Sequence, residues 1–188
     1  MRICVYCSSS NDVDRVYFEA ARRLGSLLAA RGDTLIYGGA NVGLMGTLAR
    51  AVSAGGGKVT GVIPEVLRAK RITYEEADRL IVTRTMHDRK ATMARYGDAF
   101  IALPGGFGTL EELTEILTQR QLQIHDKPLV LLNVREFYKP LIALFEHFYR
   151  ERFARRWDGL FHVAEDAEGV FEHLDPYRDE PVGSGQEA

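Results

Sequence analysis

The chain has few of the features that mark secreted, membrane or nucleic-acid-binding proteins. Only two of its 188 residues are cysteine, which excludes a disulfide-rich secreted scaffold. No apolar run approaches the roughly 20 residues of a membrane span, and the first residues lack a signal-peptide pattern. The net charge of −2 argues against a general nucleic-acid binder, which is usually basic. We therefore expect a cytoplasmic protein that binds neither membranes nor nucleic acid.

The sequence also has little that would hold a metal ion. Cys4 and Cys7 form a C-x-x-C pair, but residues three apart on a strand point to opposite faces of a sheet. Two ligands would not complete a zinc site, and the histidines show no ligand spacing. We expect buried, reduced thiols, no metal and no cofactor.

Composition and length predict one folded domain with a short tail. Hydrophobic residues make up 46% of the chain and charged residues 27%, both ordinary for a globular protein. We place the domain at residues 1–174. Residues 175–188 (DPYRDEPVGSGQEA) lack apolar side chains to bury, so we expect a disordered tail.

Short apolar runs alternate with amphipathic segments along the chain. The pattern predicts strands at 2–7, 34–37, 58–63, 79–83, 99–103, 128–133 and 159–163. It predicts helices at 14–31, at 86–96, from Thr109 onward, at 138–152 and at 167–174, with another of small residues ending at Ala54. Residues 65–78 read as loop with a short helix. The strand runs are continuously apolar, as in strands covered on both faces. The fold class is therefore α/β, a Rossmann-like doubly wound parallel sheet flanked by helices.

Three polar or glycine-rich turns follow predicted strands and should meet in one crevice. They are 8–11 (SSSN), 38–46 (GGANVGLMG) and 105–109 (GGFGT). In parallel sheets, ligands sit at the carboxyl ends of the strands. The third turn leads from a buried strand into a helix, where free N–H groups and the helix dipole attract anions. We predict a phosphate there. Neither glycine turn matches a dinucleotide fingerprint or a P-loop, and each could instead be a tight connection without a ligand.

Glu112 has two interpretations from the sequence alone. Thr109 and Glu112 match a capping box with Thr109 at the N-cap and Glu112 at N3, which would be purely structural. A carboxylate beside a phosphate is repulsive, however, unless it binds sugar hydroxyls or acts on a water or leaving group. The spacing does not decide between the two.

The segment 86–90 (MHDRK) places adjacent cations at a helix start, where they oppose the dipole. Such a local misfit is more frequent at functional sites. Of the eight Arg and Lys residues between Arg68 and Arg95, we expect most to be solvated. Arg89 and Lys90 are the two that we assign to an anionic substrate.

The residues 104–112 (PGGFGTLEE) resemble the P-G-G-x-G-T-x-x-E signature of the Lonely Guy proteins, which are cytokinin riboside 5′-monophosphate phosphoribohydrolases once labelled lysine decarboxylases. The segments CVYCSSS, YGGANVGLMG and MHDRKATM resemble further family motifs, so the similarity extends from about Ile3 to about Leu174. One departure is Arg71, where many members carry glutamate; Glu75 matches a nearby family acid.

The resemblance implies an enzyme that uses water to cleave the N-glycosidic bond of an adenine-type nucleoside monophosphate, and a homodimer with its site near the interface. Arg89 and Glu112 would be the catalytic pair. The implied substrate-binding residues are Ser9, Gly39, Gly43, Met86, Lys90, Pro104, Gly105, Gly106, Phe107, Gly108, Thr109, Glu111 and Thr118.

Two other functions stay open at this point. One is a nucleotide carrier or sensor of the same fold without hydrolysis. The other is lysine decarboxylation, which usually needs pyridoxal phosphate. The sequence also leaves open whether the base is adenine or an N6-prenylated adenine. Phe107 and Met93 could line a pocket for an N6 tail, but core packing explains both equally well.

Overall fold

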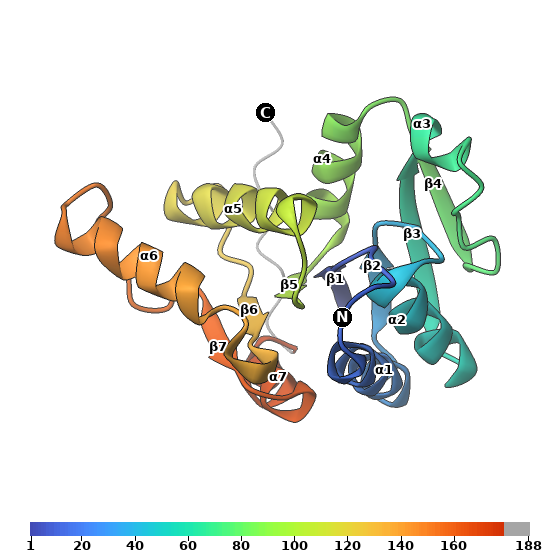
Figure 1. Cartoon of the computed structure of the whole chain (residues 1–188), viewed down its shortest axis with the longest axis horizontal. Helices are drawn as coiled ribbons and strands as arrows, with labels where there is room; N and C mark the ends of the chain where they lie inside the picture. Colours follow the sequence, from blue (N-terminus) through green and yellow to red (C-terminus); the bar gives the residue numbers. More distant parts are fainter. Residues whose placement is uncertain (179–188) are drawn as a thin grey trace.

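A computed structural model describes residues 1–178, which form a seven-stranded parallel sheet in the order β4-β3-β2-β1-β5-β6-β7 (Figure 1). The seven strands are β1 (Arg2–Tyr6), β2 (Thr34–Tyr37), β3 (Lys58–Pro64), β4 (Arg79–Thr83), β5 (Ala99–Ala102), β6 (Leu129–Leu132) and β7 (His162–Ala164). Every neighbouring pair of strands is parallel. The predicted fold class is confirmed.

Helices cover both faces of the sheet (Figure 1). One face carries α1 (Arg15–Ala30), α2 (Gly43–Ala54) and α7 (Ala167–Leu174). The other carries α4 (Met86–Tyr96), α5 (Phe107–Gln121) and α6 (Lys139–Arg150). The short α3 (Glu65–Arg68) lies between β3 and β4, and 3-10 turns occupy Val134–Glu136 and Asp175–Tyr177.

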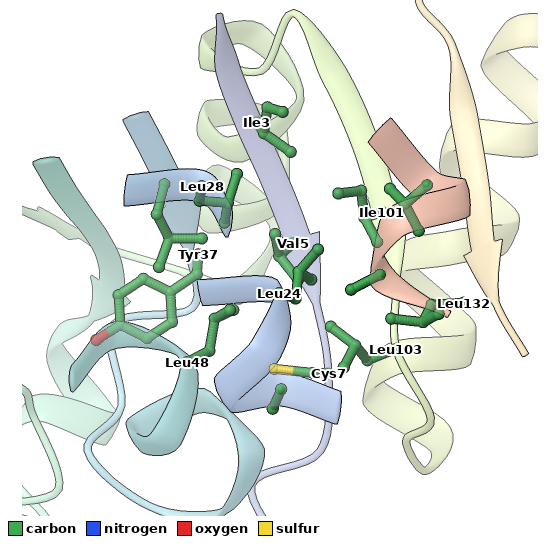
Figure 2. Close-up of a cluster of buried hydrophobic side chains, with 14 of the residues drawn as sticks. Ile3, Val5, Cys7, Leu24, Leu28, Tyr37, Leu48, Ile101, Leu103 and Leu132 are labelled. Atoms are coloured by element: carbon green, nitrogen blue, oxygen red, sulfur yellow. The ribbon is translucent and has the colours of Figure 1, made fainter. Parts of the chain in front are cut away.

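Two apolar cores lie on the two faces of the sheet. Figure 2 shows part of the first, in which Val5 and Leu24 pack beside Cys7. Cys4 belongs to the second core, on the opposite face. Both cysteines are buried free thiols, as expected for positions three apart along a strand.

The order of strands reverses direction beside β1. From β1 the chain builds outward through β2, β3 and β4, and then returns to place β5 on the other side of β1. Tyr6, the last residue of β1, pairs with Ala102, the last residue of β5. This is the switch point at which open α/β sheets hold their ligands, and the three polar turns follow β1, β2 and β5 around it.

Several predicted boundaries agree with the structure and others do not. The ranges 34–37, 79–83, 86–96 and 167–174 are those observed. The last strand begins at His162 rather than at Gly159, whose φ of +88° does not fit a strand. α5 begins two residues before Thr109, with consequences for the site.

The ordered chain extends past residue 174. Asp175–Tyr177 form a 3-10 turn, and Arg178 donates hydrogen bonds to the Arg31 carbonyl and to the Asp33 carboxylate. The predicted disorder is therefore wrong for residues 175–178, because charged side chains anchor them. Residues 179–188 of the predicted tail lie outside the described residues. No helix within residues 1–178 is long and apolar enough to cross a membrane.

Candidate functional site

The N-terminus of α2, in the second glycine-rich turn, is already occupied by the chain itself. The Gly43 N–H donates to the Asn11 side chain at 2.9 Å, and the Leu44 N–H donates to the Ser8 carbonyl at 3.0 Å. Gly43 has φ +59°, and a Cβ there would lie 2.4 Å from the Ser9 backbone. The turn therefore serves as a tight connection that holds the serine turn in place.

The N-terminus of α5 is different. Its N-cap is Gly106, which provides no side-chain cap. Within residues 1–178 the N–H groups of Phe107, Gly108 and Thr109 have no hydrogen-bond acceptor. A Cβ added to Gly106 or Gly108 would meet nothing within 4 Å. The lack of a side chain at these two glycines is therefore not needed to avoid a clash within the chain. It leaves open space beside the free N–H groups, which an approaching anion requires.

The predicted capping box at Thr109 is wrong. The helix starts at Phe107, so Thr109 lies within its first turn and Glu112 is one and a half turns in. Thr109 packs against Gly105, where a Cβ would lie 2.1 Å from its Oγ1. The T-x-x-E spacing matched the capping-box pattern, but the helix begins at an earlier residue than that pattern suggested. The structural alternative for Glu112 thereby loses its basis.

Glu112 instead forms a buried ion pair with Arg89. The Arg89 Nη1 donates to Glu112 Oε1 at 2.7 Å, and their side chains are 5% and 4% exposed. Arg89 Nε donates to the Val62 carbonyl at 3.1 Å. Its Nη2 lies so close to Gly38 that a Cβ there would be 2.0 Å away. The guanidinium is thus fixed between α5, β3 and the turn after β2.

Burial raises the pKa of Glu112, and the charge and hydrogen bond of Arg89 offset part of that rise. The pair comes from two motifs 23 residues apart, which the sequence identified separately. A buried carboxylate with an arginine partner beside free helix N–H groups can position a water or a sugar hydroxyl near a bound phosphate.

Lys90 lies beside this pair, and its ammonium contacts two carboxylates of α5. Its Nζ lies 2.7 Å from Glu111 Oε1 and 2.8 Å from Glu115 Oε2. Hydrogen bonds to Glu111 and Glu115 raise the pKa of Lys90. Both Lys90 and Glu111 therefore have partners within the chain.

The remaining predicted site residues do not all meet at this pair. Ser9, Met86 and Phe107 are exposed near the carboxyl edge of the sheet, and Phe107 is 92% exposed. Gly39 is buried, and its carbonyl accepts from the Tyr74 N–H. Thr118 is exposed and lines a cavity of about 240 Å³ with side chains of α6, on another side of α5 from Glu112.

Met93 and Phe107, which the sequence suggested as walls of a pocket for an N6 tail, also lie in different parts of the structure. Met93 is a core residue, 1% exposed, whereas Phe107 borders a depression of about 310 Å³ that also includes Leu110 and Phe137. Arg71 and Glu75, at the departure from the family pattern, are both exposed. Of the eight cations from Arg68 to Arg95, only Arg89 and Lys90 are not exposed, as expected.

Sequence reasoning missed three features. The first is the hydrogen bond from Arg89 to the Val62 carbonyl, which the sequence does not indicate because every residue has a backbone carbonyl. Glu115 lies one turn beyond Glu111, a spacing that places both carboxylates on one helix face and could have indicated a shared cation. Thr85 and Asp88 form a capping box at the start of α4 with bonds of 3.0 and 3.2 Å, which offsets the misfit of cations there.

Comparisons with known proteins show which family the chain belongs to. A family model described as possible lysine decarboxylase matches residues 45–174. The cytokinin riboside 5′-monophosphate phosphoribohydrolase LOG of Oryza sativa is 47% identical over 169 residues, covering 90% of this chain and 66% of that protein. The chain belongs to the LOG family.

Other members of the LOG family give similar figures. LOG5 of Arabidopsis thaliana, a cytokinin riboside 5′-monophosphate phosphoribohydrolase, is 43% identical over 98% of this chain and 80% of its own length. The probable phosphoribohydrolase LOGL2 of Oryza sativa is 49% identical over 82% of this chain. The chain covers 63% of the length of LOGL2.

Solved structures share the fold. A molybdenum cofactor binding protein of Rippkaea orientalis superposes with a TM-score of 0.72 at 23% identity, covering 94% of this chain and 96% of that one. The Moco carrier protein of Chlamydomonas reinhardtii gives a TM-score of 0.70 at 26% identity, covering 93% and 94%. The LOG-family fold is thus also found in proteins described as carriers.

Proposed function

We propose that this protein is a phosphoribohydrolase that cleaves adenosine 5′-monophosphate, plain or N6-prenylated, into the free base and ribose 5-phosphate. The observation that carries the proposal is the buried Arg89–Glu112 pair beside the uncapped N-terminus of α5. The relatives at 43% to 49% identity that are named for this reaction support it.

In the proposed complex the phosphate lies at the start of α5. The N–H groups of Phe107, Gly108 and Thr109 point out of the helix end, and Gly106 and Gly108 leave room for oxygen atoms to approach. Binding energy from this remote group would hold the glycosidic bond near the catalytic pair.

The reaction breaks the bond between C1′ of the ribose and a nitrogen of the base, and water supplies the new C1′ oxygen. Positive charge develops on the sugar and negative charge on the departing base. Glu112 Oε1 is bonded to Arg89, while Oε2 makes no hydrogen bond within residues 1–178. That oxygen is therefore placed to stabilise the sugar cation, hold a ribose hydroxyl or orient the water. Arg89 would offset charge on the phosphate or the base.

The test is release of free base, measured by liquid chromatography with AMP and isopentenyladenosine monophosphate as substrates of one preparation. We expect release from at least one. Arg89→Ala and Glu112→Ala should each lower kcat by about 10³-fold or more, because each removes a charged group from the reacting bond. Arg15→Ala, an exposed residue of α1 on the opposite face of the sheet, is the control and should stay near the wild-type rate.

No release of base from any purine monophosphate would reject the proposed reaction. Near wild-type turnover in either alanine variant, with a fold unchanged by circular dichroism, would reject the catalytic assignment.

A carrier or sensor is the second candidate, because the Chlamydomonas Moco carrier has this fold at 26% identity. That function predicts saturable nucleotide binding by calorimetry with no product after long incubation. The buried Glu112 favours the hydrolase, since a carboxylate beside a bound phosphate would weaken simple binding.

Lysine decarboxylation has less support. Its chemistry usually requires a lysine amine that forms a Schiff base with pyridoxal phosphate. Lys90 is the lysine beside the catalytic pair, and its two carboxylate partners hold it as the charged ammonium rather than the nucleophilic amine. A pyridoxal absorbance band in the purified protein would revive this function.

We further propose that the protein acts as a homodimer in the cytoplasm. Large apolar side chains stay exposed on the single chain, notably Phe107, Phe153 and Leu122, and such surface is typical of interfaces. The two free thiols fit a reducing compartment. A monomer mass by light scattering at working concentration would reject the dimer.

A further inference from the structure

The turn between β5 and α5, residues 103–106, is held by few hydrogen bonds of its own. The Leu103 N–H donates to the Tyr6 carbonyl at 2.9 Å. Pro104 has no N–H group, and within residues 1–178 the N–H groups of Gly105 and Gly106 have no acceptor. Because glycine allows many backbone conformations, the two glycines do not fix the turn by themselves. Another contact must determine where the free N–H groups of α5 point.

The Tyr138 hydroxyl supplies such a contact. It donates to the Leu103 carbonyl at 2.6 Å, and Tyr138 is only 4% exposed. Burial raises the pKa of this hydroxyl, so it keeps its proton and remains a donor at ordinary pH. The ring also borders the depression of about 310 Å³ that Gly105 and Gly106 line. A side chain that follows β6 thus contacts the turn that follows β5.

This hydrogen bond restricts the backbone that leads to the helix. The carbonyl oxygen lies in the peptide plane between Leu103 and Pro104, so holding the oxygen holds the plane. The proline ring fixes the φ of Pro104 at about −65°, and the residue before a proline is restricted to extended conformations. The freedom that remains before the N-cap, Gly106, lies in the ψ of Pro104 and in the glycines. The hydroxyl therefore limits where the start of α5 lies.

The segment that presents Tyr138 has an unusual backbone. Arg135 and Glu136 are consecutive residues with φ of +52° and +58°, a region that side chains other than glycine disfavour. Two contacts brace it: Asn133 Oδ1 accepts from the Tyr138 N–H at 2.8 Å, and Arg135 Nη1 donates to Asp14 Oδ2 at 2.9 Å. Strained backbone persists only where surrounding contacts determine it, and it is frequent at functional sites. The strain thus favours a functional reason for the placement of Tyr138.

We propose that Tyr138 is a positioning residue for the phosphate-binding turn at the start of α5. This inference rests on the proposed function, in which the substrate phosphate lies at the N–H groups of Phe107, Gly108 and Thr109. Tyr138 has no contact with the phosphate in this arrangement and acts through the backbone that precedes the helix. Donors that are already in place bind an anion more tightly, because ordering the turn no longer costs free energy on binding.

The test compares Tyr138→Phe with wild type by calorimetric titration of ribose 5-phosphate and by steady-state kinetics. The variant keeps the ring and loses only the hydroxyl, so it should fold, with Tm lower by about 2–4 °C. Its Kd for ribose 5-phosphate should rise about five- to tenfold, as expected for the loss of one hydrogen bond. KM for AMP should rise by a similar factor, while kcat stays within about threefold because the catalytic pair is unchanged.

Tyr74→Phe is the matched control. Tyr74 is 3% exposed, and its hydroxyl donates to Ser53 Oγ on α2 at 3.1 Å. This variant removes the same group from a buried ring that makes no hydrogen bond to the turn before α5. It should lower Tm by a similar amount and leave the Kd for ribose 5-phosphate within about twofold of wild type.

Three results would overturn the inference. Unchanged ribose 5-phosphate affinity in Tyr138→Phe would make the hydroxyl a purely structural group. An equal loss of affinity in Tyr74→Phe would show that binding follows stability rather than the contact to Leu103. A fall in kcat of about tenfold or more with KM unchanged would place the effect of Tyr138 at the reacting bond instead of at the phosphate.

Failure of the proposed function gives a different result. Wild-type protein would then release no base, but titrations with ribose 5-phosphate and AMP would still compare the variants. The inference survives in that case only if Tyr138→Phe weakens binding of these ligands and Tyr74→Phe does not. If wild-type protein bound neither ligand, no phosphate would be held at the turn and the inference would be rejected.

Discussion

The structure gives Glu112 a different role from the helix cap that its spacing in the sequence suggested. Its spacing from Thr109 suggested a helix cap, but the observed N-cap is Gly106 and Glu112 pairs with Arg89 in the interior. A buried carboxylate costs free energy unless it is paired, and truncating one partner leaves the other charge unsatisfied. The buried Arg89–Glu112 pair lies at the switch point of the sheet, where ligands bind, so a functional role explains it best.

The raised pKa of Glu112 predicts the shape of the acid limb. If catalysis needs the ionised carboxylate, kcat/KM must fall as the pH drops through the pKa of Glu112 in the free enzyme. Because burial raises that pKa above the ordinary glutamate value of 4.5, the midpoint should lie above pH 4.5. The measurement is kcat/KM for AMP across the acid range at constant ionic strength.

The phosphate of the substrate also titrates, with a second pKa of about 6. Glu111→Gln distinguishes the two groups, because it moves the limb only if Glu112 is responsible. An acid limb centred at or below 4.5 would contradict the assignment of Glu112 as the ionised group.

At the level of elements, two glycine-rich turns that look alike have different roles. The turn before α2 donates its N–H groups to Ser8 and Asn11, whereas the turn before α5 keeps its N–H groups free. The glycines differ accordingly: Gly43 lies against backbone and has a positive φ, while Gly108 faces open space.

This contrast predicts opposite effects of the same substitution. Gly108→Ala should leave the free energy of unfolding unchanged or raise it by about 0.5–1 kcal/mol, because alanine is favoured over glycine within a helix. The same change should weaken ribose 5-phosphate binding, since the added methyl group would lie in the space proposed for the phosphate. Thermal melts and calorimetry measure the two effects.

Gly43→Ala is the matched control. It should lower the free energy of unfolding by several kcal/mol, because the new Cβ would lie 2.4 Å from the Ser9 backbone at a positive φ. If Gly108→Ala destabilised the fold and left ligand binding intact, the start of α5 would be a structural turn and not an anion site.

At the scale of the whole molecule, the end of the described chain is tied to the edge of β2. Asp33 is buried, and its carboxylate accepts from Arg31 and from Arg178. Arg31 also pairs with Asp175 and lies over the Phe171 ring. These contacts, together with the Tyr177 ring beside His173, order residues 175–178.

Arg178→Ala should therefore reduce stability modestly. Asp33 keeps its other partners, so we expect a loss of about 1 kcal/mol, or about 2–4 °C in Tm for a protein of this size. Differential scanning calorimetry measures it. Arg68→Ala, an exposed residue of α3, is the control and should leave Tm unchanged; an equal drop in both variants would reject the role of Arg178.

The sequence by itself determined the parallel α/β architecture, most strand positions and both motifs of the site. These depend on local patterns: apolar runs long enough for strands, helical periodicity, and glycine clusters between them. The pairing of Arg89 with Glu112 was an expectation from family resemblance, because nothing in spacing alone brings residues from α4 and α5 together.

Tertiary structure decided what those motifs do. It assigned the free helix end to α5, because the serine turn fills the end of α2. It buried Glu112 against Arg89, because α5 starts at Phe107 and turns that side chain toward β1 and β3. It paired Lys90 with Glu111 and Glu115, and it placed Thr118 on a different side of α5 from Glu112. Each outcome depends on which elements lie side by side across the sheet, and that arrangement is set by contacts between residues distant in the sequence.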